Sequence, residues 1–153
     1  MFDSINISHI FVFDQEKALD FYVGKLGMEV SNDMNLGFMR WLTVRVPGEE
    51  GRDVLLELPG PPGMDEKTAS QVRESITKGG SGFALGLTTS DCRKTYETLK
   101  ARGVEFSEEP TEHPYGIDCG LRDPFGNHLR VVQLAVQPDG KVASAPKAGA
   151  RRR

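Results

Sequence analysis

The sequence is poor in cysteine, in long apolar runs and in basic residues outside its C-terminus. Cys92 and Cys119 are its two cysteines, too few for a disulfide framework or a zinc ribbon, so we interpret both as reduced core residues. No run approaches the roughly 18 apolar residues of a membrane span. The N-terminal Met-Phe-Asp-Ser lacks the charged-then-apolar pattern of an export signal. The sequence therefore predicts a cytoplasmic protein without a membrane partner.

Positive charge is concentrated near the C-terminus. Residues 135–153 hold five of the 19 basic side chains and one of the 22 acidic ones. Residues 1–134 therefore carry 14 basic and 21 acidic side chains, a net charge of −7. Binding of nucleic acid needs a basic stripe on the folded surface, so the acidic body argues against a nucleic acid partner. The last segment has too little apolar content to pack, and we predict that residues 135–153 form a disordered basic tail.

The most informative stretch couples a turn to a buried strand. In Asp123-Pro124-Phe125-Gly126-Asn127, proline fixes φ, glycine and asparagine tolerate positive φ, and the aspartate can accept backbone hydrogen bonds. The residues that follow, from His128 to Gln133, alternate in the period-2 pattern of a strand. The stretch predicts a hairpin turn that leads into the last strand.

Two halves of the chain share one order of elements. In the first half, strands are predicted over residues 5–13, 28–31, 38–46 and 53–58, with a helix from about Gln15 to Lys25 that Asp14 caps and Gly27 ends. In the second half, Asp91 and Gly103 bracket a helix in the same way, at offsets of 77 and 76 residues from Asp14 and Gly27. Strands are predicted there at residues 83–88, 104–106, 115–121 and 128–133. Residues 66–78 are predicted to form a surface helix between the halves. The repeat predicts two strand-helix-strand-strand-strand modules, at about 4–60 and 80–134.

Three motifs together carry a resemblance to a known family. They are Asp14-x-x-x-Ala18-x-x-Phe21-Tyr22 leading to Leu26-Gly27, Leu99-Lys100-Ala101-Arg102-Gly103-Val104, and the Asp-Pro-Phe-Gly-Asn turn. Residues 4–134 resemble the vicinal oxygen chelate superfamily, which includes glyoxalase I, extradiol dioxygenases, fosfomycin-resistance enzymes and bleomycin-binding resistance proteins. The resemblance implies an α+β fold, with two βαβββ modules in tandem forming a curved antiparallel sheet around a cavity. It also implies a homodimer, since family members commonly pair two chains.

The resemblance further implies four metal-ligand positions, one on each of four strands. In this sequence those positions hold Ile7, Glu57, Ala84 and Arg130. Isoleucine and alanine have no donor atom, and a guanidinium is a permanent cation without a free lone pair. We therefore expect no metal cofactor, and a salt bridge between Glu57 and Arg130 is one way to fill the place of the cation. A divalent metal held by a displaced set, His9, Glu57 and His128, remains the alternative.

The expected ligand-binding residues combine flat rings with a few charged groups. Aromatic side chains suit a planar ligand because they give a large contact area at low entropy cost. The candidate residues are His9, Phe38, Arg40, Trp41, Glu57, Phe83, Tyr115, His128 and Arg130. No catalytic residue can be assigned.

Three functions follow from the sequence. The first is metal-independent binding of a small organic ligand, of the kind seen in drug-sequestering antibiotic resistance proteins. The second is a metal-dependent lyase, isomerase or dioxygenase that uses displaced ligands. The third is a regulatory or structural protein whose cavity is filled by its own side chains.

Overall fold

The computed structural model describes residues 1–136 and 139–141. The first half contains β1 (Ile7–Phe11), α1 (Gln15–Leu19), the π-helical η1 (Asp20–Lys25), β2 (Glu29–Asn35), β3 (Arg40–Arg45) and β4 (Asp53–Glu57). Helix α2 (Glu66–Thr77) follows. The second half contains β5 (Phe83–Thr88), α3 (Cys92–Ala101), β6 (Glu105–His113), β7 (Gly116–Arg122) and β8 (His128–Leu134). None of the described helices has both the length and the apolar character needed to cross a bilayer.

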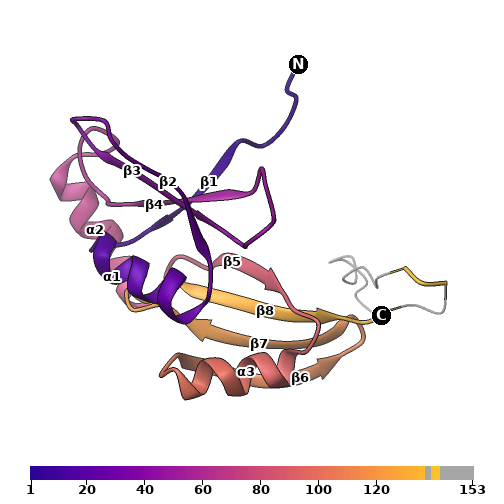
Figure 1. The fold of residues 1–153 in the computed structure, drawn as a ribbon. Coiled ribbons are helices and arrows are strands. Elements are labelled where there is room, and N and C mark those ends of the chain that lie inside the picture. The colour runs from indigo at the N-terminus through magenta and orange to yellow at the C-terminus, as the bar shows by residue number, and fades with distance from the viewer. Residues whose placement is uncertain (137–138, 142–153) are drawn as a thin grey trace, which may run out of the picture. The chain divides into compact units, whose positions relative to one another are not determined.

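The strands form two four-stranded sheets that share one topology (Figure 1). Their orders are β1-β4-β3-β2 and β5-β8-β7-β6, which confirms the α+β fold of two βαβββ modules. The first sheet is mixed where an antiparallel one was expected, because β1 pairs with β4 in parallel. The helix that follows β1 carries the chain back, so that β2 runs in the same direction as β1. The two antiparallel pairings that follow leave β4 parallel to β1. The pairs β2–β3 and β3–β4 are antiparallel.

The predicted helix boundaries are confirmed by capping. Asp14 accepts a 3.0 Å hydrogen bond from the backbone N–H of Lys17, and Asp91 accepts one of the same length from Lys94. Gly27 and Gly103 follow the two helices with φ values of 76° and 82°, the left-handed region in which glycine is unstrained. Local sequence is therefore sufficient to place both helices.

Strand β6 is longer than the sequence predicted. The sequence predicted a strand at residues 104–106, but β6 runs through Pro110 to His113. Proline donates no ladder hydrogen bond, and it is tolerated here because β6 is the outer strand of its sheet. This extension brings Glu108 and His113 into the second sheet.

The chain divides into two compact units whose boundary differs from the module boundary. One unit consists of Met1–Leu85 and Arg122–His128, and the other begins with Gly86–Leu121 and resumes at Leu129. The Asp-Pro-Phe-Gly-Asn turn thus belongs to the first unit. There Asn127 donates a 2.8 Å hydrogen bond to the carbonyl of Phe11, and the rings of Phe13 and Phe125 lie 5.3 Å apart.

Each unit buries an apolar core between a sheet and a helix. In the first unit, Tyr22 is fully buried with Leu42, Leu56 and Val12. In the second, Leu99 of α3 is buried, as are Leu121 and Leu129 of the sheet. Cys92 and Cys119 are free and buried, as expected, and burial raises the pKa of the Cys119 thiol to about 12. A thiol with so high a pKa is a poor nucleophile at neutral pH.

The predicted disordered tail falls largely on residues 137–138 and 142–153, which lie outside the described residues. Its first residue is paired, since the backbone N–H of Ala135 donates a 2.8 Å hydrogen bond to the carbonyl of Tyr115.

Candidate ligand-binding site

The first sheet brings two of the candidate residues onto one of its faces. Strand register places His9 opposite Leu55, and Leu55 opposite Thr43. Because side chains alternate along a strand, Glu57 shares this face with His9. The opposite face carries Ile10, Leu42 and Leu56, all buried. Leu55 and Thr43 on the His9 face are buried as well, so the partly exposed polar candidates on this face are His9 and Glu57.

His9 and Glu57 are brought together on that face. His9 Nδ1 lies 3.0 Å from Glu57 Oε2, and the two side chains are 49% and 30% exposed. The edge of the His9 ring packs against Phe11, with ring centroids 4.6 Å apart. His128, the third member of the displaced metal set, lies instead beside Gly79 and Arg122. Among the described residues, the three-residue group with ligand atoms within 4.8 Å of one another is Glu108, His113 and Asp118.

A cavity of about 450 Å³ opens where β3 begins and β4 ends. We name it the Phe38 cavity; its lining residues are Gln15, Glu66 and the segments 38–40 and 57–63. Phe38 is 66% exposed, and Leu58 next to Glu57 is 48% exposed. The segment 59–63 reads Pro-Gly-Pro-Pro-Gly, with a cis peptide bond between Pro61 and Pro62. The cavity thus combines an exposed ring, a methionine and a proline-rich wall with a few polar groups.

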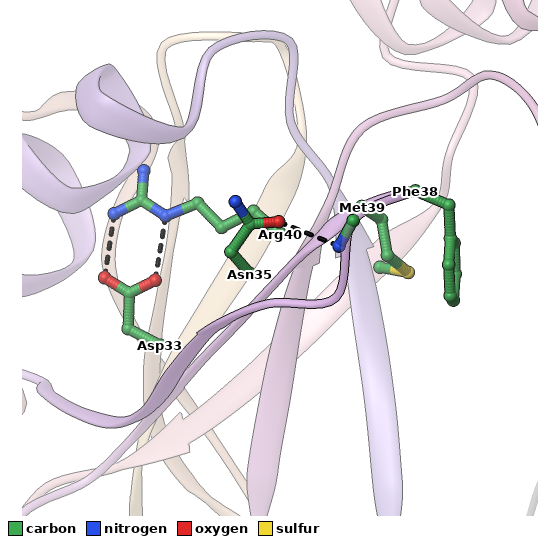
Figure 2. A pocket seen from close by; sticks show the side chains of 6 residues that line it. Asp33, Asn35, Phe38, Met39 and Arg40 are labelled. Carbon is green, nitrogen blue, oxygen red and sulfur yellow. Dashed lines mark hydrogen bonds and ion pairs between the residues drawn. The ribbon is translucent and has the colours of Figure 1, made fainter.

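Arg40 is held by two acidic side chains. Its guanidinium donates two parallel hydrogen bonds of 2.9 Å to Asp33 and one of 2.6 Å to Glu16. The bonds from Arg40 hold the pKa of Asp33 below its usual range. Figure 2 shows the paired Arg40 and Asp33, with the Phe38 ring pointing away from them. These residues line a neighbouring hollow of about 410 Å³, and Arg40 is already engaged within the protein.

In the second unit, Arg130 joins two acidic side chains from neighbouring strands. It donates a 2.6 Å hydrogen bond to Glu108 of β6 and a 2.5 Å hydrogen bond to Asp118 of β7. The Asp118 side chain is 8% exposed. Burial by itself would raise the pKa of Asp118, but hydrogen bonds from Arg130 and Tyr115 outweigh burial and lower it. Asp118 is therefore ionised at neutral pH, and the guanidinium supplies its counter-charge.

Tyr115 and His113 complete this cluster. The Tyr115 hydroxyl donates a 3.0 Å hydrogen bond to Asp118, and its ring stacks on His113 with centroids 4.9 Å apart. Burial, followed by the bond to Asp118, raises the pKa of Tyr115, so the phenol keeps its proton and remains a donor. His113 Nε2 lies 3.0 Å from Asp118 Oδ1, although neither atom makes a hydrogen bond of good geometry. We regard this contact as an ion pair that forms when His113 is protonated.

The remaining candidates occupy different surroundings. Trp41 is half-buried on β3 and faces Met34 of β2 in register. Phe83, at the start of β5, is 75% exposed. The loop at residues 59–63, which forms a cavity wall, was not among the site residues predicted from the sequence, and neither were Glu108, His113 and Asp118. A signal for Asp118 was present, because an acidic residue in the middle of a predicted buried strand requires a partner.

Comparison with known proteins identifies the family. Residues 3–131 match the Glyoxalase/Bleomycin resistance protein/Dioxygenase superfamily, and the chain belongs to this family. UcmS2 has a similar structure, with a TM-score of 0.82 and 38% identity over 87% of this chain and 99% of that one.

Two further relatives cover most of the chain. TnmS3, an antibiotic binding protein from Streptomyces sp. CB03234, has a TM-score of 0.69 and 28% identity, over 88% of this chain and 98% of its own. The uncharacterized protein YurT of Bacillus subtilis is 34% identical over 84% of this chain and 98% of its own.

Proposed function

We propose that this protein binds a small organic ligand, such as a flat and partly polar antibiotic or other aromatic natural product, without a catalytic metal. The observation that carries the proposal is the Phe38 cavity, at about 450 Å³. This volume lies within the usual range of ligand pockets, which are mostly apolar with a small number of polar groups. The similarity to an antibiotic binding protein supports the same class of ligand.

The shape of the ligand follows from the walls of the Phe38 cavity. The exposed Phe38 ring offers a stacking surface, and Met39 and the prolines offer adaptable and rigid apolar contacts. Gln15 and Glu66 add polar groups at the edge. Arg40 contributes its apolar stem, because its guanidinium is already bonded to Asp33 and Glu16. These walls favour an aromatic system that carries neutral hydrogen-bonding groups.

The absence of a catalytic metal is proposed from the residues at the family's ligand positions. Ile7 and Ala84 provide no donor atom, so Glu57 stands without the three protein ligands of an ordinary catalytic metal site. Arg130 has no free lone pair, and its guanidinium is already bonded to Glu108 and Asp118. The residues therefore do not fit the metal, and we derive no reaction step through one.

The test uses the intrinsic fluorescence of Trp41, the single tryptophan of the chain. We expect saturable quenching by planar aromatic compounds such as flavone, acridine and naphthol. Phe38→Ala should weaken the binding by about tenfold or more, because it removes the stacking surface. Phe2→Ala is the matched control, since Phe2 is 94% exposed and outside the cavity lining.

Metal analysis of the purified protein separates this proposal from its alternative. We expect less than stoichiometric zinc, nickel, manganese and iron, and ligand binding that persists in the presence of a chelator. The close approach of His9 and Glu57 is the feature that favours a metal-dependent lyase, isomerase or dioxygenase. A stoichiometric metal lost in His9→Ala, with activity abolished by the chelator, would establish that enzyme and overturn our proposal.

A further inference from the structure

Two basic side chains lie together on the first unit, and neither has an acidic partner among the residues that the structure describes. Arg122 ends β7 and His128 begins β8, and they flank the turn whose ends are joined by a 3.0 Å hydrogen bond from Asp123 N–H to the carbonyl of Asn127. Both side chains pack over Gly79. A Cβ atom at Gly79 would lie 2.9 Å from His128 Nε2 and 3.2 Å from Arg122 Nη1. The two groups are close enough for one oxyanion to accept hydrogen bonds from both.

The acidic residues near this pair are already engaged. Asp123, next to Arg122, is buried and accepts hydrogen bonds from Tyr22, from Asn127 and from three backbone N–H groups. Glu74, one turn before the end of α2, pairs with Lys78 at 2.7 Å. Within residues 1–136 and 139–141, no hydrogen bond or ion pair involves the side chain of Arg122 or of His128. Their donors are therefore available, although the body of the chain is strongly acidic.

The end of helix α2 does not account for the pair. Cations are favoured near a helix C-terminus, by roughly 0.3–1 kcal/mol each. The carbonyls of Glu74, Ser75 and Ile76 already accept hydrogen bonds from the backbone N–H groups of residues 78–80. The helix thus offers Arg122 and His128 a weak field and no hydrogen bond. Both side chains are half-buried, and a half-buried guanidinium with free donors is suited to an anion.

From this geometry we infer that Arg122 and His128 form an oxyanion-binding site, with Gly79 as its floor. The Arg122 guanidinium donates two parallel hydrogen bonds to a phosphoryl or carboxylate group, and His128 donates a third through Nε2–H. A glycine is needed at position 79 because any side chain there would occupy the place of the two basic groups. The site is separate from the Phe38 cavity, with which it shares no residue.

The experiment is an NMR titration of the three histidine side chains of the full-length protein. Sodium phosphate and sodium benzoate are added in separate arms, at constant ionic strength maintained with sodium chloride. We expect a saturable shift of the His128 ring resonance, with His9 as an internal reference. A stronger response to phosphate would assign the site to phosphorylated compounds, and a stronger response to benzoate to carboxylates.

Two pairs of variants test the residues. Arg122→Gln should weaken anion binding by about tenfold or more, because a hydrogen bond to a charged group is lost. Arg93→Gln, which removes an exposed arginine paired with Glu112, should leave it unchanged. Gly79→Ala should also weaken binding, whereas Gly82→Ala carries similar backbone strain with no atom within 4 Å of its Cβ and should not. A His128 resonance that fails to saturate, or saturates equally in Arg122→Gln, would overturn the inference.

Discussion

The hydroxyl of Tyr22 donates a buried 2.7 Å hydrogen bond to Asp123, which lies 101 residues further along the chain. Burial, followed by the charge of Asp123, raises the pKa of Tyr22 well above its ordinary value, so the phenol remains a donor at all physiological pH values. The bond connects the helix of the first module to the turn of the second module's hairpin. It explains why that turn belongs to the first compact unit.

We expect Tyr22→Phe to lower the free energy of unfolding by about 1–3 kcal/mol, because the buried Asp123 carboxylate loses a donor. Urea denaturation followed by Trp41 fluorescence provides the measurement. Tyr96→Phe is the control, since the Tyr96 hydroxyl bonds to part-exposed groups and should cost less than half as much. An equal decrease in the free energy of unfolding in the two variants would show that the Tyr22–Asp123 bond stabilises the fold no more than the hydrogen bonds of Tyr96 do.

Gly126→Ala should destabilise the protein strongly. A Cβ at this position would lie 2.4 Å from the carbonyl oxygen of Ile76, and φ is +105°. Both α2 and the turn would have to move, at a cost of about 3 kcal/mol or more. Gly37→Ala, at φ +87° with no atom within 4 Å, isolates the backbone strain, and we expect about 1 kcal/mol for it. Thermal denaturation that ranks Gly37→Ala as equal or worse would contradict the close approach to Ile76.

Asp118→Asn should destabilise the protein in a pH-dependent way. The lowered pKa of Asp118 means that its ionised form stabilises the fold above the unfolded-state value of about 3.9. That stabilisation is lost as the pH falls through the lower folded-state pKa. At pH 7 we expect a loss of about 2 kcal/mol, because Arg130 keeps its charge with one carboxylate partner fewer.

The measurement is urea denaturation of wild type and Asp118→Asn from pH 7 to pH 3, and the two curves should converge at the acid end. Glu112→Gln, which breaks the exposed pair with Arg93, serves as the control and should change stability by less than about 0.5 kcal/mol. A difference that stays constant over the pH range would rule out a charge effect at Asp118.

Removal of the residues after Val136 should leave the melting temperature nearly unchanged. The sequence beyond this point shows no periodic apolar residues, and the bond from Ala135 to Tyr115 would be retained. A decrease beyond about 5 °C, more than ~1 kcal/mol for a protein of this size, would show that the segment packs on the body.

We expect a homodimer in solution. Met34 and Leu36 are exposed on the β2–β3 hairpin, at the outer strand of the first sheet, and pairing would cover such an edge. Multi-angle light scattering at micromolar concentration should give twice the 16.9 kDa of the chain. A measured mass equal to that of one chain would contradict the predicted homodimer.

The sequence by itself determined the elements and their order. Asp14, Asp91, Gly27 and Gly103 act on backbone groups within a few residues, so their effects can be recognised without knowledge of the fold. The repeat then implied two equivalent modules, and the family motifs implied their topology. Strand β6 was misjudged because the effect of Pro110 depends on whether its strand lies at an edge, and pairing partners distant in the chain decide that.

Only the tertiary structure decided which charged groups meet. Arg130 was recognisable as a poor metal ligand from its chemistry, but its partners Glu108 and Asp118 come from two other strands. The sequence suggested Glu57 as a partner for Arg130, and the structure pairs Glu57 with His9. The approach of Arg122 and His128 to Gly79 likewise joins residues more than forty positions apart. Such contacts depend on strand register and on the packing of helices against sheets, which no local pattern specifies.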